Sequence, residues 1–303
     1  TFQVLDAGAV CAKRRVVYLV RHGQSAWNKA QSQGDVHGMA RCTDHPLSEK
    51  GLAQCRALRD RVDEAGRDGD AMAREFRCPG ALFSSPLCRT LQTTAMVFSE
   101  WAAGEGGVGE IVMMPGAREV QNIGGFDSRA TRRGGEVVRG VLNEMSATRH
   151  SDRERVLLAM QQVHYDVAEV EEPWWCTANV DTGDDVDARL DDFMAQLLYM
   201  PQDTAVAVGH SLFFRNVIRG FTSELLPPDQ AKLVRQLSTN LLENCGVLRI
   251  ELDPSLGVRE RPIVAVQLAF GSSFKPHPSR FAACCSAPSG ADADTELNVV
   301  ASL

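Results

Sequence analysis

An apolar run that ends directly in charged residues is the feature that most restricts how this chain folds. The run from Val16 to Val20 is composed of Val, Tyr and Leu only, and Arg21, His22 and Gly23 follow it without a spacer. A short, uninterrupted apolar run is typical of a strand that is buried on both faces, as in the centre of a parallel sheet. The charged residues at its end therefore point to a ligand site rather than to a surface loop.

Short apolar runs and helical patterns alternate along the rest of the chain, up to about residue 270. Further strands are expected at 81–83, 111–114, 204–208, 246–252 and 263–270. Helices are expected at 48–62, after Pro86, and at 212–221. This alternation predicts an α/β protein, a three-layer α/β/α sandwich with a largely parallel central sheet.

The composition changes at both ends of the chain and in its middle. We expect residues 1–14 to be an N-terminal extension, residues 15–271 to be one catalytic domain, and residues 272–303 to be a flexible C-terminal tail. Charged and helix-forming residues dominate 128–183. We interpret this segment as a helical insertion that covers the active-site edge of the sheet.

Charge and cysteine content exclude several classes of protein. The net charge of -7 favours neither nucleic acid nor an anionic membrane as a partner, and no apolar stretch reaches the about 18 residues of a membrane span. Nine cysteines without a C-x-x-C pair, and no visible secretory leader, predict a cytoplasmic protein with reduced thiols. Lipidation of Cys284 and Cys285 is a minor alternative. We expect neither a metal nor a cofactor.

Polar residues follow four of the expected strands at their carboxyl ends. Arg21 and His22 follow the first strand, Arg89 the second, Glu119 the third and His210 the fourth. The carboxyl ends of parallel strands meet at one edge of a sheet, where ligands bind. Guanidinium groups match phosphate oxygens, and neighbouring cations keep an imidazole in its neutral, nucleophilic form. The set therefore predicts a phosphate site.

Three segments resemble the histidine phosphatase superfamily, in the branch that contains cofactor-dependent phosphoglycerate mutase and its phosphatase relatives. They are R-H-G-Q-S-x-W-N at 21–28, S-P-L-x-R-T-x-Q-T at 85–93 and G-H-S at 209–211. The segments 44–51 and 184–190 are also similar to that family. The resemblance extends from about residue 16 to about residue 270.

The resemblance implies a role for each site residue. His22 attacks phosphorus and becomes a phosphohistidine, and Glu119 donates a proton to the leaving alkoxide. The phosphoryl oxygens are bound by Arg21, Arg89, His210 and Asn28. Ser25 and Ser211 are expected near the substrate, Ser211 through its backbone N–H. The catalytic set is thus His22, Glu119, His210, Arg21 and Arg89.

The function expected from this set is a metal-independent phosphatase, a phosphoric monoester hydrolase. Its partner would be a small-molecule phosphate ester or a phosphoprotein, and the oligomeric state cannot be inferred from the sequence. A phosphoglycerate mutase is the alternative, although 118–127 lacks the E-R-H-Y-G type of segment found in the mutases resembled. A non-catalytic module that binds phosphate is a further alternative. The remaining histidines have no partners at ligand spacing and are expected to be exposed: His37, His45, His150, His164 and His277.

Overall fold

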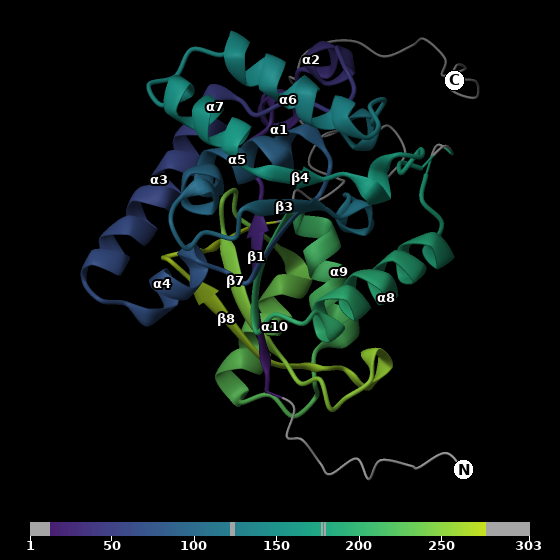
Figure 1. Ribbon diagram of the computed structural model, residues 1–303. Coiled ribbons are helices and arrows are strands. Elements are labelled where there is room, and N and C mark those ends of the chain that lie inside the picture. Colours follow the sequence, from purple (N-terminus) through teal and green to yellow (C-terminus); the bar gives the residue numbers. More distant parts are fainter. Residues whose placement is uncertain (1–12, 122–124, 177, 179, 277–303) are drawn as a thin grey trace, which may run out of the picture.

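A seven-stranded sheet lies at the centre of the computed structural model, which describes residues 13–121, 125–176, 178 and 180–276 (Figure 1). The strand order is β4-β3-β2-β5-β1-β7-β8. All pairings among strands β1 to β5 are parallel. Strand β7 is antiparallel to both of its neighbours, β1 and β8. The largely parallel sheet that the sequence predicts is confirmed. The bounds are β1 (Arg15–Arg21), β2 (Ala81–Ser84), β3 (Glu110–Met113), β4 (His164–Asp166), β5 (Thr204–Gly209), β7 (Val247–Leu252) and β8 (Ile263–Ala269).

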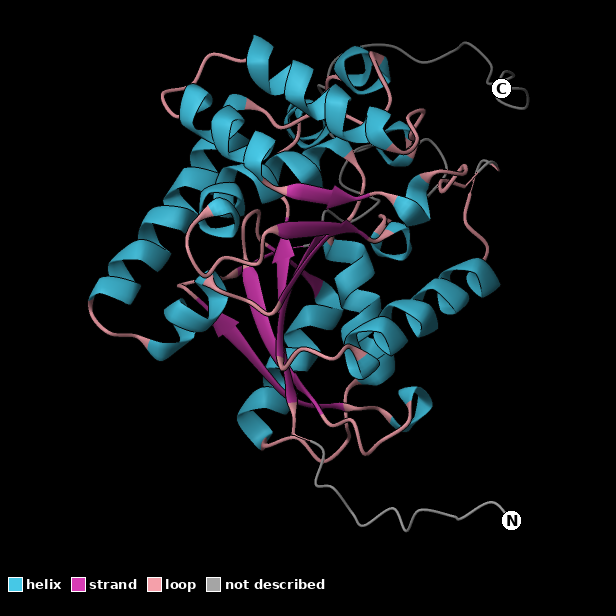
Figure 2. Ribbon diagram, viewed as in Figure 1, coloured by secondary structure: helices cyan, strands magenta, loops and turns pink. Residues whose placement is uncertain are grey.

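Helices cover both faces of this sheet, which gives the expected three layers (Figure 2). One layer contains α3 (Glu49–Arg67), α4 (Ala71–Arg77), α5 (Cys88–Ala103), α6 (Gly135–Ala147) and α7 (Arg153–Gln162). The other layer contains α8 (Gly183–Tyr199), α9 (Ser211–Phe221) and α10 (Pro228–Thr239). Two short helices, α1 (Ala26–Gln33) and α2 (Val36–Ala40), follow β1.

Strand β1 shows why the fold needs an apolar run at this position. It is hydrogen-bonded between β5 and β7, and its residues from Val17 onward are buried. Successive side chains of a strand point to opposite faces. Tyr18 and Val20 accordingly pack in the core under α3 and α5, while Val17 and Leu19 pack under α8 and α9. A strand covered on both sides cannot alternate apolar with polar residues.

The insertion at 128–183 contains more than helices. Helices α6 and α7 pack against α5, and Cys88 at the start of α5 donates to Glu144 Oε2 of α6 at 2.9 Å. The segment also supplies β4, an edge strand that pairs with β3 and that the sequence does not predict. This strand has only three residues, and a run of that length shows no usable periodicity.

The chain beyond residue 271 is partly built into the fold. Strand β9 (Phe274–Pro276) pairs with β6 (Asn240–Leu242) as an antiparallel ribbon, although the tail was expected to begin at residue 272. Most of the extension at 1–14 and of the tail, including Cys284, Cys285 and His277, lies outside the described residues. None of the helices in the described ranges combines the length and the apolar character that a membrane span requires.

Candidate functional site

Two histidines meet at the carboxyl ends of neighbouring strands. Strands β1 and β5 pair with Arg21 opposite Gly209, so the next residue of each strand, His22 and His210, lies at the same edge of the sheet. Their ring centroids are 5.1 Å apart and their planes are inclined by 60°. Both side chains are buried. The parallel register of two central strands thus brings together imidazoles that are far apart in sequence.

The hydrogen bonds of His22 fix which ring nitrogen carries the proton. Nδ1 lies 2.6 Å from the carbonyl oxygen of Gly23, and Arg89 Nε donates to Nε2 at 3.3 Å. A carbonyl accepts only, so we assign the proton to Nδ1 and the lone pair to Nε2. Burial, followed by the charges of Arg89 and Arg21, holds the pKa of His22 well below its usual value. The imidazole is therefore neutral at physiological pH.

The two arginines are anchored by backbone carbonyls. Arg21 Nη1 donates to the carbonyl oxygen of Leu242 at 2.5 Å, and Arg89 Nη1 donates to that of Asp127 at 2.5 Å. The Asp127 carboxylate also lies 3.5 Å from Arg89 Nη2. Burial lowers the pKa of Arg21 to about 10. The guanidinium is still charged at neutral pH, because this value lies well above 7. The arrangement places two fixed cations beside His22.

His210 completes this side of the site. Its Nε2 lies 3.0 Å from Ser85 Oγ, and burial together with the charge of Arg89 holds its pKa well below the usual value. Within the described ranges, His210 Nδ1, Arg21 Nε and Ser211 Oγ are buried without a hydrogen-bond partner. Buried polar atoms normally have partners, and each one left without costs about 1–3 kcal/mol. These three residues all lie at the carboxyl ends of β1 and β5, so their unpartnered atoms indicate a place where a polar group can bind.

Glu119 is directed toward the same site. Its Oε1 accepts hydrogen bonds from the backbone N–H of Val120 at 3.0 Å and from that of Phe213, in the first turn of α9, at 3.1 Å. Burial raises the pKa of Glu119 above its usual value, despite the charges of Arg89 and Arg21. With Oε1 held by two donors, Oε2 is the oxygen that can carry a proton.

Arg118 does not share the surroundings of its neighbour. Its guanidinium forms a two-pronged ion pair with Asp181, at 2.5 Å and 2.9 Å, and Arg189 approaches the same carboxylate at 2.9 Å. The Asp181 side chain is fully buried. Adjacent residues of an extended segment point to opposite sides, which separates this ion pair from Glu119.

Ser25 and Asn28 form the first turn of α1. Ser25 Oγ accepts from the backbone N–H of Asn28 at 3.1 Å, and Asn28 Oδ1 accepts from that of Ser25 at 3.3 Å, which is a capping box. The hydroxyl of Ser25 therefore caps the N-terminus of α1. Asn28 Oδ1 also lies 3.5 Å from Asn244 Nδ2, so its amide sits on the same side of the site as the residues after β6.

Gly23 lies where only a residue without a side chain fits. A Cβ at this position would be 2.8 Å from the carbonyl oxygen of Gly51 and 3.2 Å from Cys55 Sγ. Its backbone N–H donates to Thr93 Oγ1 at 3.0 Å. Helices α3 and α5 thereby clamp the residue that follows His22, which fixes the position of the Gly23 carbonyl.

Several residues of the site were not predicted from the sequence. These are Ser85, Asp127, Asp181, Asn244 and Lys275. Only Ser85 carries a local signal, because it follows a strand directly. The expectation that His45 is exposed is wrong: the ring is buried, with its centroid 5.3 Å from that of Trp27. It lies in a loop without apolar periodicity, so its burial depends on how the loop packs.

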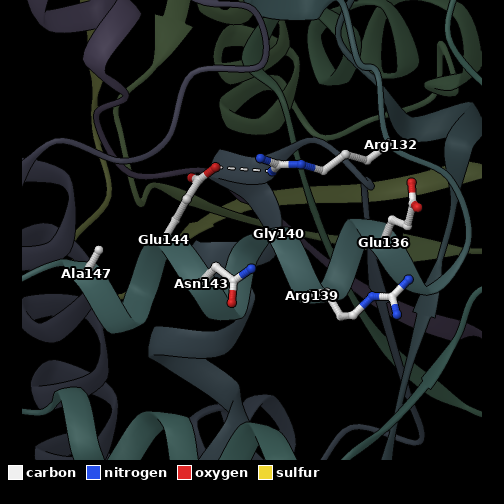
Figure 3. Close-up of a pocket in the computed structure, with 7 residues that line it drawn as sticks. All are labelled: Arg132, Glu136, Arg139, Gly140, Asn143, Glu144 and Ala147. Carbon is white, nitrogen blue, oxygen red and sulfur yellow. Dashed lines mark hydrogen bonds and ion pairs between the residues drawn. The ribbon is translucent and has the colours of Figure 1, made fainter.

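Other features of the surface lie apart from these residues. A hollow of about 490 Å³ on α6 is lined by Arg132, Arg139 and Glu144, among others, and by none of the eight predicted site residues (Figure 3). An ion pair between Arg132 and Glu144 crosses it. The described part of the chain contains no cluster of three or more His, Cys, Asp or Glu side chains that could hold a metal ion.

A family model matches part of the chain. Residues 17–132 match the model of the histidine phosphatase superfamily (branch 1), which confirms the resemblance seen in the motifs. The match includes Arg21, His22, Arg89 and Glu119, whereas His210 lies beyond it. No curated protein sequence matches this chain.

Solved structures of three similar proteins have a TM-score of 0.44 to this chain. A mycobacterial glucosyl-3-phosphoglycerate phosphatase is 17% identical, over 85% of this chain and 97% of its own. A putative α-ribazole-5'-P phosphatase from Escherichia coli is 12% identical, over 86% and 95%. A phosphoglycerate mutase from Bacillus anthracis is 16% identical, over 86% and 94%. Likenesses this distant identify no substrate for this chain.

Proposed function

We propose that this chain is a phosphatase that hydrolyses phosphate monoesters through a phosphohistidine on His22. One observation carries the proposal: His22 Nδ1 is bound to the Gly23 carbonyl, and Nε2 faces the guanidinium of Arg89. A neutral imidazole with its lone pair directed at a fixed cation is arranged to attack an anionic electrophile. The superfamily match over 17–132 supports the same reading.

In the first step, the lone pair of His22 Nε2 forms a bond to phosphorus while the ester P–O bond breaks. The Nδ1 proton stays in its hydrogen bond to Gly23, so the phosphoimidazolium keeps a partner for its positive charge. Arg21 and Arg89 stabilise the charge on the equatorial oxygens, and His210 donates Nδ1–H while Ser85 bonds to its Nε2. A fixed donor of this type typically lowers the barrier by about 3–4 kcal/mol.

Glu119 supplies the proton that the leaving alkoxide needs. Burial raises the pKa of Glu119, which favours its protonated form, and the proton leaves from Oε2. In the second step, the resulting carboxylate accepts a proton from water as the water oxygen attacks phosphorus. The N–P bond breaks, phosphate leaves, and both His22 and Glu119 return to their starting states.

Rapid acid-quench labelling with a radioactive phosphate ester tests the intermediate. Wild type is expected to carry a label that is acid-labile and alkali-stable, and His22→Ala is expected to carry none. His164→Ala is the matched control, because His164 is exposed at the start of β4, at the edge of the sheet opposite the site, and pairs with Glu110. An unlabelled wild type that binds phosphate would indicate a non-catalytic module. Fast isomerisation of 3-phosphoglycerate with negligible phosphate release would indicate a mutase.

The role of Glu119 is tested by comparing leaving groups. Glu119→Gln is expected to slow an alkyl phosphate by about 10²–10⁴-fold, because the alkoxide no longer receives a proton. It should affect p-nitrophenyl phosphate far less, since p-nitrophenolate leaves without one. Glu110→Gln is the control, because Glu110 begins β3 at the opposite end of the sheet. Equal loss for both leaving groups would mean that another residue is the acid.

A further inference from the structure

Strand β9 brings a lysine to the site from the end of the described chain. In the β6–β9 ribbon, Lys275 is paired with Leu241, and Phe274 is paired with Leu242. The carbonyl oxygen of Leu242 is the acceptor that anchors Arg21. The ribbon is therefore part of the wall beside the phosphate-binding arginine, and Lys275 lies in that wall.

A chain of hydrogen bonds connects Lys275 to the nucleophile. Its Nζ lies 3.4 Å from Asn244 Oδ1. The amide of Asn244 donates to the carbonyl oxygen of His22 at 3.0 Å and lies 3.5 Å from Asn28 Oδ1. Asn244 thus holds three groups together: the backbone of His22, the side chain of Asn28 and the ammonium of Lys275.

The charge of Lys275 is not matched by a carboxylate. Within the described ranges it forms no ion pair, although its side chain is half-buried. The charged groups that act on it are Arg21 and Lys50, which repel it, and Glu243, which attracts it. Burial lowers the pKa of Lys275 to about 8. Partial burial of a cation among other cations is unfavourable unless an anion is bound beside it.

We propose that Lys275 determines specificity by binding a second anionic group of the substrate, a carboxylate or a further phosphate, outside the reacting phosphoryl group. This inference rests on the proposed function and adds the substrate class, an ester with two anionic ends. Arg21 is buried in the site and Lys50 is exposed on α3, and both are close enough to Lys275 to repel its half-buried ammonium. The reacting phosphoryl group already has two guanidiniums and an imidazole.

Two probes that differ only at the second anionic group test the proposal. 3-Phosphoglycerate carries a carboxylate where glycerol 3-phosphate carries a hydroxymethyl group. Their Kd values are measured by calorimetry in a His22→Ala background, in which the proposed mechanism allows no turnover. With Lys275 present, 3-phosphoglycerate is expected to bind about tenfold or more tightly than glycerol 3-phosphate, as is typical of a hydrogen bond between charged groups.

Substitution of Lys275 should remove this preference. Lys275→Met keeps the aliphatic stem and the strand, and is expected to bring the two Kd values to within about twofold of each other. Lys275→Arg should restore most of the preference, and Lys232→Met, at an exposed lysine of α10, should leave it unchanged. Three outcomes would overturn the inference. The preference for 3-phosphoglycerate could be unchanged in Lys275→Met, both probes could lose affinity equally in that variant, or the protein that retains Lys275 could show no preference.

A turnover assay tests the proposed function independently of the role of Lys275. Wild type and Lys275→Met are both assayed with p-nitrophenyl phosphate, which has no second anionic group. Release of phosphate by both variants supports the proposed function whatever the binding data show. Absence of release from wild type would refute hydrolysis, while the difference in Kd between the two probes would still decide the role of Lys275.

Discussion

Removal of the Asp181 carboxylate is expected to be the most destabilising single change around the site. Asp181 accepts from Arg118 through both oxygens, from Arg189, and from the backbone N–H of Gln121 at 2.8 Å. Asp181→Ala leaves two partly or fully buried guanidiniums without their anion. Breaking one partner of a buried pair typically costs about 3–5 kcal/mol. That is a large share of the about 5–15 kcal/mol that stabilises a domain.

Urea denaturation at pH 7 measures this loss. The midpoint of Asp181→Ala should fall while the slope with urea stays the same, and thermal unfolding should shift by roughly 6–20 °C at about 2–4 °C per kcal/mol. Asp203→Ala is the matched control: Asp203 also pairs with two cations, Lys13 and Arg15, but on the surface. Exposed pairs contribute little because water screens them, so this variant should be nearly neutral.

A double variant provides the internal check. Arg118→Met removes the second charge of the broken pair and keeps an apolar side chain of similar length. Asp181→Ala combined with Arg118→Met should therefore be less destabilised than the sum of the two single variants, by about 0.5–3 kcal/mol. A loss of stability in Asp181→Ala no larger than that in the Asp203→Ala control would refute the reasoning.

Two further predictions concern the histidine edge of the sheet. The pKa values of His22 and His210 are held below those of the unfolded chain, so their contribution to stability is full above about pH 6.5 and is lost as the pH falls. Both groups therefore destabilise the fold as the pH falls from about 7.5 to about 5.5, and His22→Ala should make the loss in unfolding free energy over this range smaller than in wild type. Gly23→Ala places a Cβ 2.8 Å from the Gly51 carbonyl and should lower activity on p-nitrophenyl phosphate by more than about 10²-fold by displacing His22. Gly183→Ala, where nothing lies within 4 Å of the added Cβ, is the control, and equal activity of the two variants would contradict the role assigned to Gly23.

Local sequence patterns account for the sheet and for one part of the site. A short apolar run bounded by polar residues favours a covered strand, and both Val16 to Val20 and Ala205 to Val208 form one. Parallel strands have their carboxyl ends at one edge, so the meeting of His22 and His210 follows from their positions after such runs. These inferences need only neighbours in sequence and the geometry of a sheet.

The remaining residues are placed by contacts between distant segments. Asp181 meets Arg118 because the end of the insertion returns to the segment after β3, and Lys275 meets Asn244 because β9 pairs with β6. Asp181 and Lys275 read locally as ordinary charged residues of polar segments. The sequence by itself determined which strands are buried and which side chains stand at their ends. Only the tertiary structure decided that Asp181 is the counter-charge of Arg118 and that Lys275 lies beside the site. The reason is that burial of a charge depends on what packs over it from elsewhere in the chain.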